Sequence, residues 1–395
     1  MISFDAAIAI IRSTARPLGT ERIGIEQAAW RVLASPVIGA IDSPRADVSA
    51  MDGYAVRGAD LAALPTRLMI IGESFPGAGW PDILEPGTCV RIFTGAPIPR
   101  GTDRIVIQEQ VRRDHRNAFI EADPGPATWI RRRGGDFRAG DTILAAGSLL
   151  DPAALIAAAG ADCAEVEVAM RPRLALLSTG DELVQPGTAH RSALAVPDSV
   201  SVGIGALVDA WGAIVSGWGR LGDDLAAMEA AARELAEAAD VIIVTGGASV
   251  GERDFAKAMF EPLGLELLFS KVAIRPGKPA WFGRIGKKLV LGLPGNPTSA
   301  LVTARLLVAP LLTMMLDRPL EAALGWEPAR LVSPLPACDA RETFHRARLS
   351  SGAVSLVGFQ ESHAQKALAD ADVLVRQPAN SQPMPAGEIV EVLEL

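Results

Sequence analysis

The chain has 395 residues, of which 49% are hydrophobic and 21% charged, and its formal net charge is −8 at pH 7. This composition indicates a well-packed soluble protein of two to four domains and excludes global disorder. The acidic balance argues against a general nucleic-acid-binding protein, although a small anion in a local basic pocket remains compatible with it.

The cysteines and the apolar stretches indicate the cellular compartment. The three cysteines are far apart and form no C-x-x-C pair, so neither a disulfide framework nor a structural zinc site is expected. The N-terminus carries Asp5 and no basic leader, which is typical of a capped amphipathic helix and not of a signal peptide. The apolar stretch 306–316 is too short to cross a bilayer and is broken by Pro310. We expect a cytoplasmic protein without a membrane partner.

The composition and the expected secondary structure change twice within the first 170 residues. Residues 1–40 are expected to be helical, with one helix capped by Ser3 or Asp5 and a second near 25–34. Residues 41–140 are rich in glycine and proline and predict a β-rich, barrel-like insertion. Its strand-like runs are 68–71, 89–93, 104–108 and 118–121. Residues 141–170 return to small apolar side chains, with a helix start at Asp151-Pro152, and should pack with 1–40 as one helical linker domain.

Residues 171–316 predict an α/β domain, and 317–395 a C-terminal β-barrel-like domain. The four β-branched residues 241–244 are typical of a strand buried on both faces, and a glycine-rich loop follows them. Strand, polar glycine loop and helix recur after 174–177, 213–216 and 289–293. This order predicts a parallel sheet with helices on both faces, whose loops share one ligand crevice at the carboxyl ends of the strands.

Two glycine motifs within this domain have alternative readings. Residues 217–222 spell G-x-G-x-x-G, but no acidic residue ends the next strand, so dinucleotide binding is not expected. Residues 247–251 spell G-x-S-x-G, which would make Ser249 the nucleophile of a serine hydrolase. The available histidines, His345 and His363, fall in the terminal β domain, so an anion-binding loop is the favoured reading.

Acidic side chains follow three of the predicted strands. They are Asp181, Glu182, Asp223, Asp224, Glu252 and Asp254. Any of them could be a solvated residue or a helix N-cap, and the pair at 223–224 suits a cap. Several carboxylates in one crevice nevertheless repel each other unless a cation intervenes, and Mg²⁺ takes one or two carboxylates together with phosphate oxygens. A metal-assisted phosphate site is therefore predicted.

A basic cluster lies between two of the predicted strands, 241–244 and 289–293. Lys271, Arg275 and Lys278 fall within eight residues that proline and glycine stiffen. Such a cluster is usually a solvated edge, but beside the carboxylates it favours an anionic substrate bound together with a metal.

Seven segments resemble, in order, the motifs of the molybdopterin molybdenumtransferase family, which the plant and gephyrin E domains share. They are SAMDGYAVR at 49–57, FTGAPIPRG at 93–101, IRRRGGDFRAGD at 130–141, STGDEL at 178–183, TGGASVGERD at 245–254, AIRPGKP at 273–279 and GLPGNP at 292–297. The resemblance implies a transferase that inserts molybdenum from molybdate into adenylylated molybdopterin and releases AMP with Mg²⁺. It implies an elongated four-domain homodimer, in which Asp52 and Thr94 enter the active site of the other subunit.

The same resemblance implies a role for each matching residue. Asp52, Glu182, Asp223 and Asp254 would be catalytic, and Asp181 and Glu182 would be metal ligands. The substrate-binding positions would be Thr94, Ser249, Lys271, Arg275, Lys278, Pro294 and Pro297. A molybdopterin adenylyltransferase would donate the substrate, and molybdoenzyme chaperones would be further partners. Val200 stands where the family commonly has asparagine, so a non-catalytic pterin-binding scaffold is a further alternative.

Overall fold

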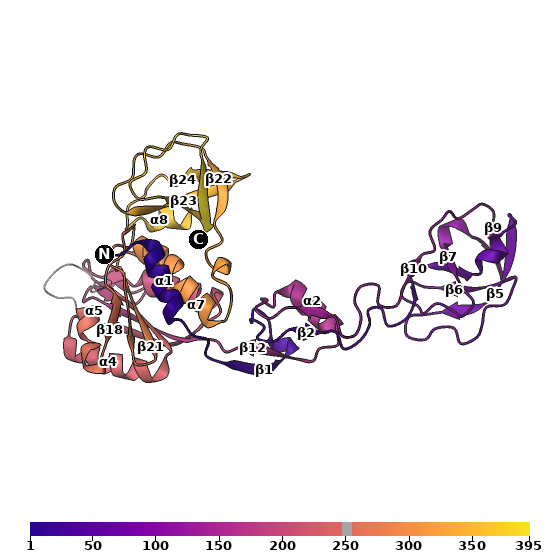
Figure 1. Ribbon diagram of the computed structural model, residues 1–395, viewed down its shortest axis with the longest axis horizontal. Coiled ribbons are helices and arrows are strands. Elements are labelled where there is room, and N and C mark those ends of the chain that lie inside the picture. Colours follow the sequence, from indigo (N-terminus) through magenta and orange to yellow (C-terminus); the bar gives the residue numbers. More distant parts are fainter. Residues whose placement is uncertain (247–254) are drawn as a thin grey trace. The chain divides into compact units, whose positions relative to one another are not determined.

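The computed structural model describes residues 1–246 and 255–395 (Figure 1). The described residues divide into two units, each with its own apolar core. The main unit comprises Met1–Glu21, Trp30–Ala34 and Val168–Leu395, and the inserted unit comprises Arg22–Ala29 and Ser35–Glu167.

A six-stranded sheet with the order β16-β13-β17-β21-β20-β18 organises the main unit. Its strands are β13 (Arg173–Thr179), β16 (Ile214–Leu221), β17 (Val241–Thr245), β18 (Glu266–Phe269), β20 (Trp281–Ile285) and β21 (Lys288–Leu293). The first four strands in the order pair in parallel, and β20 runs against β21 and β18. All five residues of the central strand β17 are buried, as its unbroken apolar run predicts.

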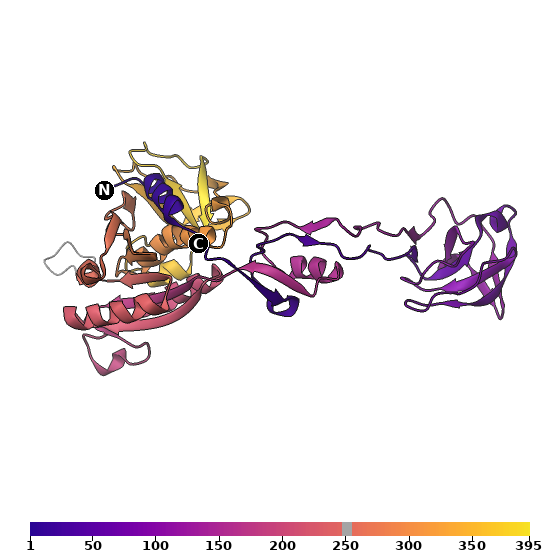
Figure 2. The ribbon, with the colours of Figure 1, turned by 60° about the horizontal axis from the view of Figure 1, so that its bottom comes forward.

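Helices cover both faces of this sheet, as expected (Figures 1 and 2). On one face, Ile243 of β17 packs in a core with α1 (Phe4–Thr14), α3 (Ser199–Ala210) and the helices that follow β21. On the other face, Ile242 packs with α4 (Leu225–Ala238) and α5 (Phe255–Ala258). The alternation of neighbouring side chains along one strand therefore supplies both layers.

The apolar helix after β21 is longer than the sequence suggested. It runs through α6 (Pro297–Thr303), a π-helical segment (Ala304–Val308) and α7 (Ala309–Met315). Of the most apolar 18 residues of this helix, 89% are buried inside the protein. The expectation that Pro310 breaks this stretch was wrong. Pro310 lies in the first turn of α7, directly after the π segment, where the regular helical hydrogen bonding has already changed.

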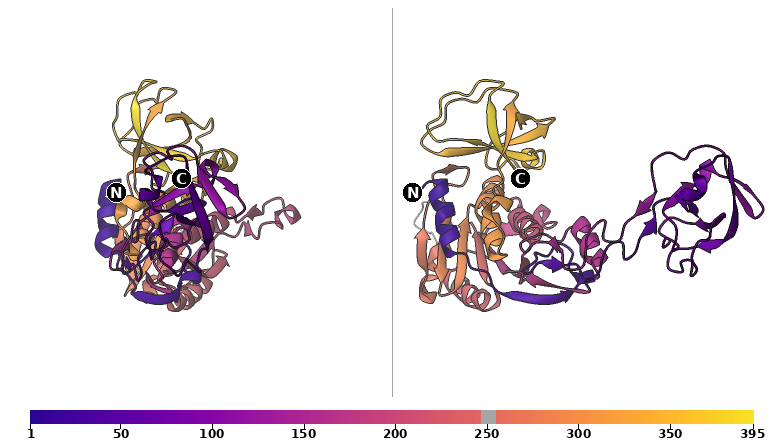
Figure 3. Two further views of the ribbon diagram at one scale, coloured as in Figure 1. Left: turned by 90° about the vertical axis from the view of Figure 1, so that its right-hand side faces the viewer. Right: turned by 45° about the vertical axis from the view of Figure 1, so that its right-hand side comes forward.

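A closed barrel completes the main unit (Figure 3). Its strands are β22 (Glu327–Leu331), β23 (Glu342–Ser350), β24 (Ala353–Leu356), β25 (Val373–Gln377) and β26 (Ile389–Glu394), and the pairing of β23 with β25 closes the ring. The short strand β19 (Ile274–Arg275) joins β23 in parallel. Phe344 of β23 stacks edge-on against Phe4 of α1, with ring centroids 5.2 Å apart, so the barrel shares the core of the α/β domain.

The inserted unit contains a second β-rich sheet, with the order β7-β4-β6-β5-β9-β8 (Figure 2). Its strands are β4 (Gly53–Val56), β5 (Thr66–Ser74), β6 (Thr88–Ile92), β7 (Arg104–Ile107), β8 (Arg112–Asp114) and β9 (Asn117–Ile120). The four strand runs expected in this region are confirmed. The unit also holds β2 (Val37–Ile38) paired with β11 (Thr142–Leu144), and β3 (Val48–Ser49) paired with β10 (Ile130–Arg131). The helix α2 (Pro152–Gly160) begins as predicted, because Asp151 Oδ1 accepts a hydrogen bond of 2.8 Å from Ala154 N.

Two local expectations were wrong. The helix expected near residues 25–34 is only a 3₁₀ turn at Ile25–Gln27, and Leu33 forms an antiparallel bridge with Val168. That pairing joins segments more than 130 residues apart, so it leaves no local pattern. The glycine motif at 217–222 was expected to be a loop, but β16 continues to Leu221. A Cβ on Gly219 would lie 2.6 Å from Leu177 Cδ1, so glycine lets β16 approach β13 closely.

Candidate active site at the carboxyl end of the sheet

A cavity of about 1040 Å³ opens where the parallel strands of the main sheet end. The residues that follow β13, β17 and β21 line it, as the rule for open α/β sheets predicts. Its lining includes Thr179, Gly180, Glu182, Asp198, Val200, Asp223, Thr245, Gly246, Pro294, Gly295, Asn296, Pro297 and His363. We call this space the sheet-edge cavity.

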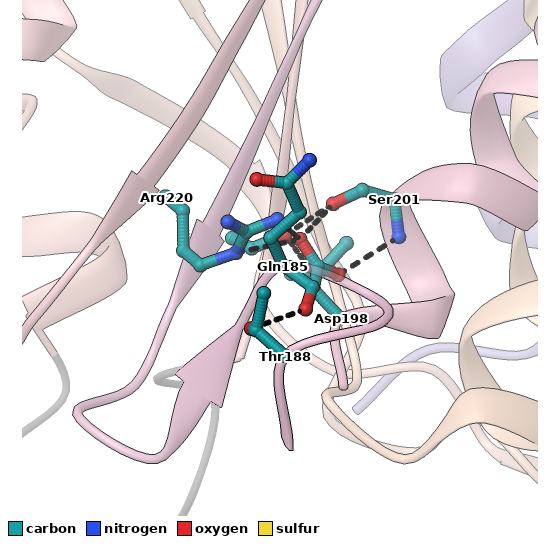
Figure 4. A network of polar contacts seen from close by, with 7 residues as sticks. Gln185, Thr188, Asp198, Ser201 and Arg220 are labelled. Atoms are coloured by element: carbon teal, nitrogen blue, oxygen red, sulfur yellow. Dashed lines mark hydrogen bonds and ion pairs between the residues drawn. The ribbon is translucent and has the colours of Figure 1, made fainter. Parts of the chain in front are cut away.

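A buried polar network holds the floor of the sheet-edge cavity in place (Figure 4). Asp198 is only 3% exposed and caps α3, accepting hydrogen bonds from Ser201 N at 3.1 Å and Ser201 Oγ at 2.8 Å. Arg220 of β16 forms an ion pair with the same carboxylate, with Nη2 lying 3.2 Å from Asp198 Oδ2. The Ser201 hydroxyl also contacts that of Ser178, to which Thr245 Oγ1 donates at 3.2 Å. The start of α3 is thereby tied to the ends of β13, β16 and β17.

Two of the predicted acidic residues, Glu182 and Asp223, line the sheet-edge cavity. Within residues 1–246 and 255–395, the carboxylates of Glu182 and Asp223 make no ion pair and no side-chain hydrogen bond. Asp181 does not line the cavity, but its Oδ1 accepts a hydrogen bond of 3.0 Å from the Asp223 N–H. The neighbouring Asp224 has the capping role that the sequence allowed for the pair, because its Oδ1 accepts from Ala226 N and Ala227 N.

Two glycines make this arrangement of carboxylates sterically feasible. A Cβ on Gly222 would lie 2.5 Å from Asp181 Oδ1, and a Cβ on Gly180 would lie 2.7 Å from one carboxylate oxygen of Glu182. Gly180 also has a φ of 148°, which other residues rarely adopt. Both carboxylates therefore lie over backbone that has no side chain, and a larger residue at either position would displace them.

A second cavity of about 560 Å³ lies in the main unit between the β19 loop and the terminal barrel. Its basic lining residues are Arg275, His345 and Arg346, and we call it the basic cavity. Arg346 is 1% exposed, and no carboxylate pairs with it among the described residues. Its hydrogen-bond acceptors are neutral oxygens, including Thr298 Oγ1 at 3.3 Å and the Glu361 carbonyl at 3.2 Å.

Arg346 is a deeply buried charge in the lining of the basic cavity. Burial lowers the pKa of this guanidinium, and the nearby Glu361 opposes that shift. An arginine nevertheless stays protonated in proteins, so the buried charge is costly unless an anion accompanies it. The guanidinium lines the basic cavity and donates to Thr298 Oγ1 and to the carbonyls of Ala364 and Glu361.

The two cavities adjoin along a wall built from α6 and the loop before α8 (Gln365–Ala369). Ser362 is at the centre of this wall, because its carbonyl accepts from Thr298 N at 3.1 Å and its hydroxyl from Asn296 Nδ2 at 3.1 Å. Asn296 and His363 line the sheet-edge cavity, whereas Glu361 and Ser362 line the basic cavity. Consecutive residues of the loop 361–363 therefore line the two cavities.

The predicted basic cluster is divided by the structure. Arg275 lines the basic cavity and pairs with Asp339, with Nη2 lying 2.5 Å from Oδ2. Lys271 and Lys278 are exposed and line neither cavity, although Pro279, next to Lys278, lines the sheet-edge cavity. The predicted prolines Pro294 and Pro297 both line the sheet-edge cavity.

The remaining predicted residues are Asp52, Thr94, Ser249 and Asp254. Asp52 and Thr94 belong to the inserted unit and bind each other: Asp52 Oδ1 accepts from Thr94 N at 2.7 Å and from Thr94 Oγ1 at 2.8 Å. The backbone N–H and then the hydroxyl of Thr94 lower the pKa of Asp52. Ser249 and Asp254 lie outside the described residues.

Arg346, the charge at the centre of the basic cavity, was absent from the predicted site. It lies in the strand ETFHRARLS, where nothing distinguishes it from the exposed Arg348 two residues later. Burial against α6, which is almost 50 residues away in sequence, gives it its role. No motif in the sequence signals that contact.

Comparison with known proteins places these features in a family. Residues 2–161 match the MoeA N-terminal region (domain I and II), 175–314 a probable molybdopterin binding domain, and 328–395 the MoeA C-terminal region (domain IV). The chain is 36% identical over 388 residues to a molybdopterin molybdenumtransferase of Haemophilus influenzae, covering 95% of this chain and 94% of the relative. It is 34% identical over 407 residues to that of Synechococcus elongatus, covering 100% of both. The crystal structure of a molybdopterin biosynthesis MoeA protein from Pyrococcus horikosii superposes with a TM-score of 0.80 at 29% identity, covering 100% of this chain and 99% of that one.

Proposed function

The chain belongs to the molybdopterin molybdenumtransferase family. We propose that each of its two adjoining cavities binds one of the two substrates of molybdenum insertion. The reaction belongs to the biosynthesis of the molybdenum cofactor. The basic cavity takes molybdate, and the sheet-edge cavity takes adenylylated molybdopterin.

The buried guanidinium of Arg346 carries this assignment. Molybdate is a tetrahedral dianion, and it supplies the countercharge that Arg346 lacks among the described residues. Arg275, Ser362 and Thr343 line the same cavity and offer further donors. Arginine suits such a site because its fork of N–H groups matches two oxygens of an oxoanion.

The sheet-edge cavity suits the larger substrate. Its volume of about 1040 Å³ lies at the upper end of the range for small-molecule sites. Gly180 and Gly246 allow phosphate oxygens to approach the backbone at the ends of β13 and β17. The shared wall at Ser362 brings the dithiolene end of this substrate next to the molybdate, so molybdenum transfers over a short path.

The donor set in the sheet-edge cavity suits Mg²⁺. Glu182 and Asp223 offer carboxylate oxygens that pair with no side chain in residues 1–246 and 255–395, and Asp181 accepts a hydrogen bond from the Asp223 N–H. Among the described residues, no group of three or more acidic, histidine or cysteine side chains is placed to bind a metal. Mg²⁺ commonly takes one or two carboxylates together with phosphate and water oxygens. When bound, Mg²⁺ neutralises negative charge on the phosphoanhydride whose hydrolysis releases AMP.

Several further parts of the proposal come from the family resemblance. The enzyme acts in the cytoplasm as a homodimer, and Asp52 and Thr94 of one subunit complete the site of the other. A molybdopterin adenylyltransferase supplies the adenylylated substrate, and molybdoenzyme chaperones receive the product. The resemblance also gives Asp254 a catalytic role and gives Ser249, Lys271 and Lys278 a role in substrate binding, although Lys271 and Lys278 line neither of the two cavities.

The test is AMP release by the purified protein with adenylylated molybdopterin, molybdate and Mg²⁺. We expect release that depends on all three, and a loss of about 10²-fold in Glu182→Gln, because a charge that acts in the transition state is removed. Glu234→Gln, on the exposed side of α4, is the matched control and should keep full activity. Absence of release, with a relative active in parallel, contradicts the proposal.

The two alternatives give different results. The comparisons do not support a serine hydrolase, and a fluorophosphonate probe should leave Ser249 unlabelled. A non-catalytic scaffold would bind the pterin tightly without AMP release, whereas we expect turnover because Glu182 and Asp223 are present in the cavity.

A further inference from the structure

His345 lines the basic cavity in a fixed orientation and tautomer. Gln377 Nε2 donates to the Pro336 carbonyl at 2.7 Å, which directs Gln377 Oε1 toward the histidine. His345 Nε2 lies 2.8 Å from that oxygen and must donate to it, because an amide oxygen only accepts. Nε2 therefore carries a proton in every ionisation state, and Nδ1 is the nitrogen that titrates.

We propose that His345 takes up one proton at Nδ1 when a tetraoxoanion such as molybdate binds in the basic cavity, so that the affinity for the anion depends on pH. This inference rests on the proposed function, because it concerns the occupant of the same cavity. The inference makes His345 the residue that sets how the affinity for the anion depends on pH. The proton comes from solvent, and no covalent bond is made or broken.

The charges around His345 explain why the proton arrives with the anion. From the elements packed against it, the charged and titratable groups are Arg275 of β19, Arg346 of β23, Cys338, Asp339 and Arg341 of the segment before β23, and Glu361 of the loop after β24. Asp339 is engaged by Arg275 and Arg341, and the Cys338 thiol lies 3.0 Å from the Arg341 carbonyl. Without an anion, the imidazole therefore faces mostly positive charge.

The direction of the pH effect follows from these surroundings. Burial lowers the pKa of His345 from its usual 6.5, Arg275 and Arg346 lower it further, and the hydrogen bond to Gln377 opposes the shift. The free protein thus holds the neutral imidazole at neutral pH. A bound dianion reverses the local field and raises the pKa of His345 in the complex. The affinity for the anion therefore falls as pH rises from the pKa of His345 in the free protein to its pKa in the complex. One linked proton changes Kd by up to about tenfold per pH unit.

Calorimetric titration of the purified chain with molybdate tests this inference. Titrations between about pH 6.5 and 8.5, in buffers with different heats of ionisation, give both Kd and the number of protons taken up. We expect uptake approaching one proton and a Kd that rises with pH. His345→Gln keeps an N–H for Gln377 but cannot be protonated, so its Kd should be independent of pH. His115→Gln, on an exposed side chain of the inserted unit, should keep the wild-type profile.

A second measurement uses the unmodified protein, in case the variant is poorly folded. Nitrogen NMR of the histidine side chains should show the His345 Nδ1 resonance moving to the protonated position when molybdate is added at neutral pH. Binding without proton uptake, or uptake that His345→Gln leaves unchanged, overturns the inference and leaves the AMP-release assay as an independent test of the proposed function. A protein that releases AMP but binds no molybdate at any pH overturns the inference as well.

Discussion

Arg346 of the terminal barrel and Thr298 of α6 meet at 3.3 Å between Nη1 and Oγ1, in the wall that separates the sheet-edge cavity from the basic cavity. Thr298 is the second residue of a helix that begins where β21 ends, so the contact links the barrel to the carboxyl edge of the main sheet. The barrel therefore contributes a charge to a site that the α/β domain alone would leave without its buried cation.

Replacing Arg346 by glutamine should weaken molybdate binding by about 10- to 100-fold, because hydrogen bonds to a charged group are among the stronger ones. We expect saturating molybdate to raise the Tm of the wild type, and the same concentration should raise the Tm of the variant by less. Arg348→Gln is the matched control, since this exposed arginine lies on the same strand and pairs with Asp370. Equal molybdate affinity in the Arg346 variant and the wild type would contradict the assignment of the basic cavity.

Replacing Asp198 by alanine should destabilise the main unit by about 2 kcal/mol, because it removes the N-cap of α3 and leaves Arg220 without its partner. The expected loss of unfolding free energy is moderate because the Arg220 side chain is 34% exposed and water can solvate it. Urea unfolding measures the effect. Asp209→Ala removes the exposed partner of Arg171 and should change the unfolding free energy by less than about 1 kcal/mol.

Replacing Gly222 by alanine should lower AMP release by at least about tenfold, because the new Cβ would displace the Asp181 carboxylate from the Asp223 N–H and move a cavity carboxylate. Activity should fall much more than stability. Gly203→Ala in α3 is the matched control, since no atom lies within 4 Å of its added Cβ. That change should leave activity intact and stabilise the helix by about 0.5–1 kcal/mol.

The Asp52 carboxyl should titrate below its usual range, because the backbone N–H and the hydroxyl of Thr94 stabilise the charged form. A depressed folded-state pKa means that this contribution to stability is present above the unfolded pKa of 3.8 and is lost as pH falls through the folded value. Carbon NMR titration of Asp52 measures the shift. Thr94→Val keeps the backbone donor and removes the hydroxyl, so the pKa should rise part of the way toward 3.8; an unchanged pKa would show that the hydroxyl contributes nothing.

Local patterns in the sequence predicted a large share of the elements. The apolar run of β17, the strands of the inserted unit and the helix start at Asp151 each depend on residues that are near one another in the chain. The rule that ligands bind at the carboxyl ends of parallel strands then predicted where the sheet-edge cavity lies. Glu182 and Asp223 could be named as candidates because each lies in a polar loop after a predicted strand, and the family resemblance then implied their catalytic roles.

Only the tertiary structure decided the rest. It separated Asp223, which faces the cavity, from Asp224, which caps α4. It turned the segment around Leu33 into a partner for Val168, and it buried Arg346 against α6, where no carboxylate of the described residues forms an ion pair with it. The physical reason is that periodicity and capping record interactions between residues a few positions apart. Burial and charge compensation depend instead on partners that are distant in sequence and leave no local trace.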